Sequence, residues 1–186
     1  MRRAPLLGIA ALLALAGCAA APAVEGPREV PLANAGFEQA PVSPDCPPGW
    51  FCAARATPYS FRFFLDGSSP AEGVRSLCIE PVGHEPWAYA TQSIPDRGLG
   101  GHRVRFSMSV RVDGVTGRGG GIVARAHDGH GRTIAYAERL VTGTAGWKSL
   151  SLELDVPPGA NDVEVGGLLD GRGRVCVDEA RLAVVR

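Results

Sequence analysis

The stretch that decides the fold is the C-terminal run Val175-Cys176-Val177-Asp178-Glu179-Ala180-Arg181-Leu182-Ala183-Val184-Val185. Successive side chains of an extended chain alternate between two faces, so this run is predicted to be a β-strand. The side chains on one of its faces are then those of Cys176, Asp178, Ala180, Leu182 and Val184. That face is apolar except for Asp178. A buried carboxylate needs a cation, a metal ion or backbone donors, because an unpaired buried charge is costly.

Further short runs of alternating polar and apolar residues fill the chain from residue 31 onward, and none has the periodicity of a helix. In the clearest run, residues 102–112, the apolar side chains of Val104, Phe106, Met108 and Val110 alternate with Arg and Ser. Other strands are expected at residues 75–80, 88–94, 121–127, 133–140, 147–156 and 162–169, with turns at 128–131 and 170–173. This spacing is typical of an all-β fold, a two-sheet antiparallel β-sandwich.

The N-terminus has the features of a secretory signal. Met1-Arg2-Arg3 precedes an apolar run over residues 6–15 that is too short to span a bilayer as a helix. The run ends in Leu15-Ala16-Gly17-Cys18, which resembles the lipobox of bacterial lipoproteins, where the cysteine is lipidated and becomes the new N-terminus. An ordinary signal with an incidental cysteine is the alternative.

The lipobox resemblance implies three segments and a location. They are a signal peptide over residues 1–17, a lipid-attached flexible tether over 18–30, and one domain over 31–186. The protein is then exported and anchored in the bacterial cell envelope. Ala19, directly after the cysteine, implies transfer to the outer membrane. The 19 basic residues balance 19 acidic ones, so composition gives no indication of a nucleic-acid partner.

Four cysteines follow Cys18, and an even number in an oxidising compartment favours two disulfides. Three pairings are possible. Cys46 and Cys52 flank a turn-rich loop that closes at little entropic cost, and their pairing leaves Cys78 to bond Cys176. Four free buried thiols are the alternative. Zinc is disfavoured, because no CxxC pair or nearby histidine completes a tetrahedral set.

Several short motifs occur in the order seen in carbohydrate-binding-module-like jelly rolls. They are Asn34-Ala35-Gly36-Phe37-Glu38, Pro48-Gly49-Trp50, Gly73-Val74-Arg75-Ser76-Leu77, residues 87–94 with Gln92, residues 103–112, Gly146-Trp147 and Val177-Asp178. The chain thus resembles the galactose-binding-domain-like superfamily over nearly all of residues 30–185. This resemblance implies a jelly roll that serves as a non-catalytic binding module for a carbohydrate or a cell-envelope polymer.

The same resemblance implies a structural calcium ion where the first and last strands of the domain meet. Its ligands would be Glu38 and Asp178, with main-chain oxygens from residues 73–75. Calcium takes six to eight oxygen ligands, which this set and water could supply. The alternative is that both carboxylates accept hydrogen bonds from backbone amides and bind no metal. Glu179 stands where the family more often has a second Asp.

Sugar-binding jelly rolls use aromatic rings and a few polar side chains on one face. Trp87 and Tyr89 lie two residues apart and therefore on one face of a strand. Candidates from neighbouring strands are Arg105, Arg125, His127 and Tyr136. Core packing is the alternative for each ring, and a solvated face for each polar group. If the arginines share a face, an anionic glycan is expected. Trp50 and Trp147, beside turn glycines, are assigned to the core or rim.

Catalysis is not expected, because the chain has no GxSxG elbow, no HExxH and no phosphate-binding loop, and its four histidines are scattered. Glu38 and Asp178 could form a glycosidase pair, but calcium ligation accounts for them better. A second hypothesis is a structural or interaction lipoprotein whose jelly roll holds a protein partner. An exposed aromatic face would favour the sugar, and a flat apolar patch the protein.

Overall fold

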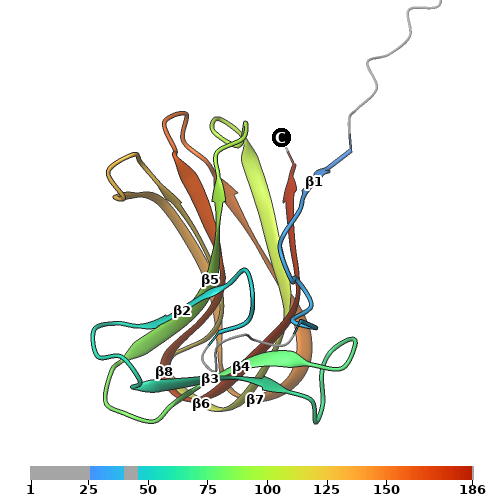
Figure 1. Ribbon diagram of the computed structural model, residues 1–186, viewed down its shortest axis with the longest axis vertical. Helices are drawn as coiled ribbons and strands as arrows, with labels where there is room; N and C mark the ends of the chain where they lie inside the picture. Colours follow the sequence, from blue (N-terminus) through green and yellow to red (C-terminus); the bar gives the residue numbers. More distant parts are fainter. Residues whose placement is uncertain (1–25, 40–45, 186) are drawn as a thin grey trace, which may run out of the picture.

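A computed structural model describes residues 26–39 and 46–185 of the chain, so Cys18 and the predicted signal peptide lie outside the described residues. The described part is all β, and it contains no helix long and apolar enough to cross a membrane. It contains eight strands, which are labelled in Figure 1. They are β1 (Arg28–Val30), β2 (Phe51–Ala54), β3 (Phe61–Asp66), β4 (Ser76–Pro81), β5 (Trp87–Pro95), β6 (Arg103–His127), β7 (Thr133–Asp155) and β8 (Asp162–Val184).

Three long strands, β6, β7 and β8, run through both layers of the sandwich, and every strand pair is antiparallel. The layer that we call sheet I has the order β2, β5, first half of β8, second half of β6 and first half of β7. Sheet II contains β3, β4, the second half of β8, the first half of β6 and the second half of β7, with β1 on the end of β8. The fold is the predicted two-sheet jelly roll (Figure 1).

Glycines allow the long strands to bend from one sheet into the other. At the crossing of β6 and β8, Gly117 and Gly171 have positive φ angles of 81° and 140°. A Cβ atom on Gly171 would lie 1.8 Å from the carbonyl oxygen of Thr116, so only glycine fits there. The turn predicted at residues 170–173 is therefore wrong, because this segment is a bend within one continuous strand. The turn at 128–131 is confirmed by the bond from Gly131 N to Asp128 O (2.9 Å).

The core lies between the two sheets and confirms the predicted alternation. The four apolar side chains named for residues 102–112 are at most 3% exposed. Leu150, Leu152 and Leu154 on β7 pack against the same core. Trp50 also belongs to it, and its indole Nε1 donates to the backbone oxygens of Ala33 and Asn34 (3.1 and 3.2 Å). The buried side chain of Gln92 bonds both N and O of Ala33, which fixes the entry of the chain into the domain.

Two predictions about the ends of the chain are wrong, one for the closing strand β8 and one for residues 28–30. A β-bulge shifts the register of β8 against β6 between Asp178 and Arg181, and Glu179 has a φ of 51°. Val175 and Val177 face the core before the bulge, and Ala180, Leu182 and Val184 face it afterwards. Cys176 and Asp178 therefore do not share the core face of the strand as predicted. At the other end of the chain, residues 28–30, expected as tether, form β1 and pair with β8.

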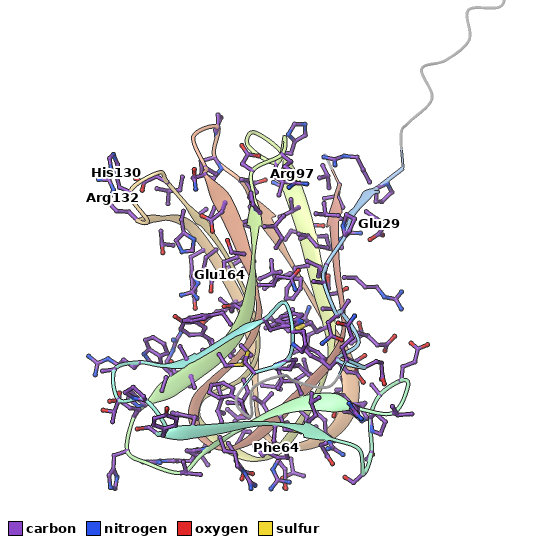
Figure 2. All side chains as sticks on the ribbon, in the orientation of Figure 1. Glu29, Phe64, Arg97, His130, Arg132 and Glu164 are labelled. Atoms are coloured by element: carbon purple, nitrogen blue, oxygen red, sulfur yellow. A yellow bond between two sulfur atoms is a disulfide. The ribbon has the colours of Figure 1, made fainter. Side chains whose placement is uncertain are left out.

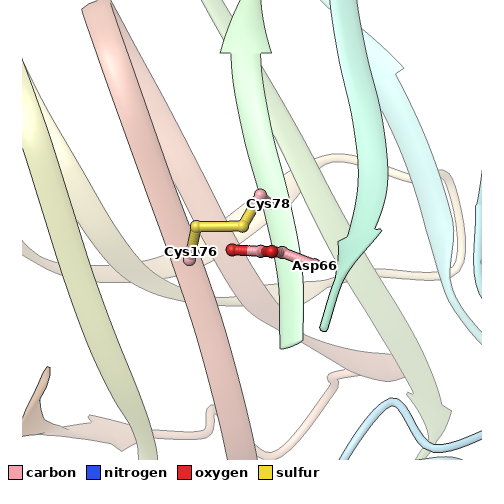
Figure 3. A group of neighbouring side chains, drawn as sticks. All are labelled: Asp66, Cys78 and Cys176. Atoms are coloured by element: carbon pink, nitrogen blue, oxygen red, sulfur yellow. A yellow bond between two sulfur atoms is a disulfide. The ribbon is translucent and has the colours of Figure 1, made fainter. Parts of the chain in front are cut away.

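Both predicted disulfides are present. Cys46 bonds Cys52, with Cα atoms 5.7 Å apart, and Cys78 bonds Cys176 across directly paired positions of β4 and β8. The second disulfide lies on the outer side of sheet II, beside Asp66 (Figure 3). These three residues are the one group of potential metal ligands found among the described residues, and its cysteines are already bonded to each other.

Candidate functional site

A cleft of about 200 Å³ opens on the outer face of sheet I. Trp87 and Tyr89 come from β5, Leu168 from β8, Arg125 from β6 and Tyr136 from β7, which are four successive strands of the sheet. The full lining is Trp87, Tyr89, Arg118, Val123, Arg125, Tyr136, Leu168 and Asp170. Strand alternation puts these side chains on the face opposite the core, because the residues between them on β5 and β6, such as Ala88, Ala90 and Ala124, are buried in it.

Aromatic rings form the two walls of the cleft. Trp87 and Tyr89 stack at 5.5 Å between ring centroids with an interplanar angle of 23°. The ring centroids of Tyr89 and Phe51 are 6.2 Å apart, and the guanidinium carbon of Arg125 lies 4.7 Å from the Tyr89 centroid. Because its neighbours crowd the ring of Tyr89, this residue supports the wall, and Trp87 presents the ring surface. Tyr136 stands on the opposite wall and is 50% exposed.

The spacing of the strands limits the width of the cleft. Three strand spacings separate β5 from β7, which corresponds to about 14 Å between their backbones. Side chains reach inward from both walls, so the gap between Trp87 and Tyr136 is narrower than this distance. Val123 and Leu168 form an apolar floor and are only 2% and 7% exposed. An apolar floor between two rings favours contact with the carbon-bound faces of sugars.

Charged groups close one end of the cleft. The Arg118 guanidinium bonds Asp170 through Nη1 (2.9 Å) and Glu138 through Nη2. Hydrogen bonding to Asp170, with the charge of Glu138, raises the pKa of Arg118. The hydroxyl of Tyr136 donates to the other oxygen of Glu138. Burial, followed by this bond to Glu138, raises the pKa of Tyr136 to about 12, so the phenol stays protonated near neutral pH.

A second polar group surrounds Glu164 of β8, which is labelled in Figure 2. Arg125 donates to Glu164 through Nη2 (2.7 Å), and Thr91 donates to the same oxygen. His127 lies 3.5 Å from Asp162 and 3.7 Å from Glu164, beside the cleft and not in its lining. The bond to Glu164 holds the guanidinium of Arg125 over the ring of Tyr89. The site thus offers preformed donors and acceptors around an apolar floor, as small-molecule sites commonly do.

Five of the six residues predicted to bind ligand lie on this one face: Trp87, Tyr89, Arg125, His127 and Tyr136. Arg105 does not, because it lies in the first half of β6 on sheet II, where it pairs with Glu153 (2.7 Å). The prediction that it joins the others is wrong, since β6 passes from one sheet to the other between the two arginines. Seven residues in or beside the cleft were not predicted from the sequence: Phe51, Arg118, Val123, Glu138, Glu164, Leu168 and Asp170. The even-numbered positions of β8 could have revealed Glu164, Leu168 and Asp170.

Glu38 and Asp178 meet the same loop, residues 71–75, from two sides. Asp178 is fully buried, and one of its oxygens accepts from the backbone nitrogens of Ala71 and Glu72 (3.0 and 3.2 Å). Glu38 accepts from those of Val74 and Arg75 (2.9 and 3.3 Å). The backbone-amide bonds that were the alternative to calcium are thus present. Burial is the largest cause of the raised pKa of Asp178, because it disfavours the charged form.

Two further carboxylates lie beside this loop. Glu72 and Glu179 are close enough to share a hydrogen bond, which raises the pKa of Glu72 and lowers that of Glu179. Glu179 also accepts from Ser109 (2.9 Å). With Glu38 and Asp178, four carboxylates therefore surround one loop. Carboxylate oxygens are ligands that calcium prefers, but among the described residues no three of these carboxylates lie close enough together to form one metal-binding group. A calcium ion would therefore be held by Glu38 and Asp178 together with main-chain oxygens of the loop.

A second, larger cavity of about 680 Å³ lies between the edges of the two sheets. Its lining comes from β2, β3, the segment between them and Val82 directly after β4, and it is mainly apolar. It includes Phe61, Phe63, the 81% exposed Tyr59 and the 62% exposed Val82. Within the described part of the chain, β2 pairs only with β5, and β3 only with β4. This apolar groove therefore has an unpaired strand edge on each side.

Comparison with solved structures shows which proteins share this fold. The CBM22-1 xylan-binding domain of Paenibacillus barcinonensis Xyn10C aligns with a TM-score of 0.56 at 21% identity, covering 81% of this chain and 92% of that chain. The C-terminal family 22 carbohydrate-binding module of Clostridium thermocellum Xyn10B gives 0.56 at 23% identity, covering 81% and 90%. TmCBM61, solved with β-1,4-galactotriose, gives 0.53 at 16% identity, covering 81% and 95%.

An enzyme also contains this fold. The enzymatically active domain of bacteriophage CBA120 tailspike protein 4 aligns with a TM-score of 0.60 at 16% identity over 74% of this chain, which spans only 20% of the tailspike chain. No family model matches the sequence, and no curated protein matches it. The structural neighbours thus include carbohydrate-binding modules that the present domain covers almost from end to end, and the chain shares their β-sandwich jelly-roll fold.

Proposed function

We propose that this protein is a non-catalytic carbohydrate-binding module that is tethered to the bacterial envelope and holds a glycan or envelope polymer in the cleft of sheet I. The observation that carries the proposal is the pair of aromatic walls, Trp87 and Tyr136, above the apolar floor of Val123 and Leu168. Aromatic rings contact the apolar faces of sugars, and the charged groups at the rim hydrogen-bond their hydroxyls. The fold shared with carbohydrate-binding modules supports it.

The non-catalytic part of the proposal rests on what the cleft contains. Asp170 in its lining, and Glu138 and Glu164 beside it, are each bonded to an arginine. A glycosidase needs one carboxyl group that is kept protonated as an acid and a second one as base or nucleophile. These carboxylates are instead bonded to guanidinium and hydroxyl groups, an arrangement that suits hydrogen bonding to sugar hydroxyls.

The proposal also includes a lipid anchor at Cys18 and a structural calcium ion. Lipidation of Cys18 would leave residues 19–27 between the membrane and β1, so the module would remain close to the envelope surface. A calcium ion held by Glu38 and Asp178 would fasten the loop at residues 71–75 to the closing strand on sheet II. Calcium would supply structural stability there, away from the cleft on sheet I.

The test is a glycan array with the full chain purified in detergent, covering neutral and acidic polysaccharides. Trp87→Ala should abolish the signal. Trp147→Ala is the matched control, because Trp147 lies in the second half of β7, on sheet II, and bonds Ser69 (3.0 Å). Absence of binding by protein whose thermal melt shows it to be folded would refute the proposal, as would equal loss in both variants.

The apolar groove between β2 and β3 favours one other candidate, an interaction lipoprotein that holds a protein partner. Unpaired strand edges beside apolar side chains can accept an extended segment of another protein. This candidate predicts a silent glycan array and capture of an envelope protein that Val82→Asp prevents. Retained capture by Val82→Asp would remove the groove as the contact.

A further inference from the structure

Both guanidinium groups of the cleft are already bonded to carboxylates of the protein. Arg118 is bonded to both Asp170 and Glu138. Arg125 is bonded to Glu164 and lies over the ring of Tyr89. A carboxylate or sulfate on a sugar is recognised by a guanidinium that can present two N–H groups to it. Here an acidic sugar that reached either arginine would lie next to a carboxylate that is already bonded to it.

The charges of the groups around the cleft also disfavour an anionic ligand. Two cations, Arg118 and Arg125, are bonded to three carboxylates, those of Glu138, Glu164 and Asp170. A fourth carboxylate, Asp162, lies next to His127 at the edge of the same face. An anion that entered the cleft would therefore stand among like charges, which disfavours binding.

We infer that the cleft takes a glycan made of uncharged sugars and rejects acidic ones, an inference that rests on the proposed function of this cleft. A sugar hydroxyl both donates and accepts, so it can use a carboxylate oxygen and an arginine N–H without breaking the pairs. An uncharged ligand is the opposite of the anionic glycan that a shared arginine face alone would favour. The specificity comes from the acidic partners on β7 and β8.

The experiment measures binding of the full chain to matched polysaccharides that share a backbone and differ in charge. One pair is homogalacturonan, fully methyl-esterified and de-esterified, and another is xylan with and without glucuronic acid. We expect the neutral member of the bound pair to bind at least about tenfold more tightly. Equal or tighter binding of the acidic member would overturn the inference while the proposed function stands. Binding to no glycan in the whole panel would overturn the proposed function and this inference with it.

Variants test the stated cause. Glu138→Gln with Asp170→Asn frees Arg118, and Glu164→Gln alone frees Arg125 without touching the other pair. Either change should raise affinity for the acidic polymer by about tenfold, and about 1 M salt should remove the gain. The control is Glu153→Gln, which frees Arg105 on sheet II and should change nothing. The inference fails if the folded cleft variants gain no more than the control does.

Discussion

The two disulfides of this chain should stabilise it to different extents, because they close loops of very different length. Cys78 and Cys176 are 98 residues apart in sequence, whereas Cys46 and Cys52 are 6 apart. A cross-link removes loop-closure entropy from the unfolded chain, by about 4.7 kcal/mol for a loop near 100 residues. The same relation gives about 2 kcal/mol for a loop of six residues.

Replacing Cys78 and Cys176 by Ala should therefore lower the free energy of unfolding by about 4 to 5 kcal/mol. Replacing Cys46 and Cys52 should lower it by about 2 kcal/mol. For a domain of this size the corresponding drops in Tm are about 10 °C or more and about 5 °C. The two double variants act as controls for each other, because each removes one disulfide and adds two alanines.

The assay is urea unfolding of the oxidised wild type and of both variants, followed by circular dichroism, with thiol alkylation to verify the remaining disulfide. Reduction of both disulfides in the wild type should lower the free energy of unfolding by more than either double variant lowers it. An equal or larger loss on removal of the Cys46–Cys52 bond would refute the loop-closure reasoning. It would show that local packing around each disulfide, and not the length of the loop, sets its contribution.

Three other predictions concern the anchor, the metal and acid stability. Cys18→Ala should release the protein from membranes into the soluble fraction, and persistent membrane association would count against lipidation. Chelator should lower the Tm of the wild type but not of Glu38→Gln/Asp178→Asn, and an unchanged wild-type melt would remove calcium from the account. Hydrogen bonds from Ser68, and then Arg111, lower the pKa of Asp66. Its contribution to stability is therefore present above its ordinary pKa and lost as pH falls through the lowered one. Asp66→Asn should accordingly reduce Tm at pH 7, and the difference from the wild type should shrink as pH falls below the ordinary pKa of an aspartate. A constant deficit would contradict this.

Sequence periodicity predicted the strands best where one face is buried. The alternation in residues 102–112 and the three leucines of β7 are visible without a structure, because core positions must be apolar and solvent positions need not be. The short strands β1, β2 and β3 were not expected. β2 runs Phe-Cys-Ala-Ala and β3 runs Phe-Arg-Phe-Phe-Leu-Asp, and neither alternates clearly.

Continuity of the long strands could not be predicted. Glycine-rich segments at residues 114–121 and 171–173 have the composition of turns, yet here they let β6 and β8 bend between sheets. Whether glycine ends a strand or bends it depends on what the rest of the chain packs against. The misplacement of Arg105 follows from this ambiguity, since it shares strand β6 with Arg125 but not the sheet.

The bulge at Asp178 and Glu179 explains why the faces of the closing strand were assigned incorrectly. One extra residue in β8 reverses the alternation, and no local sequence feature marks that position. The aromatic members of the cleft were predictable because Trp87 and Tyr89 lie two apart on one strand. Glu164 and Asp170 could have been placed on one face of β8 from the same alternation. Their pairing with arginines was not predictable, because it depends on which strands become neighbours.

The measurement that tests the central claim most directly is a double-mutant cycle on glycan affinity with Trp87→Ala and Tyr136→Ala. If both rings contact one bound sugar, each single change should weaken binding at least about tenfold. The two effects should also be coupled by at least about 0.5 kcal/mol, because the residues share a ligand. Unchanged affinity in either single variant, or strictly additive losses, would contradict a glycan held between the two walls of the cleft.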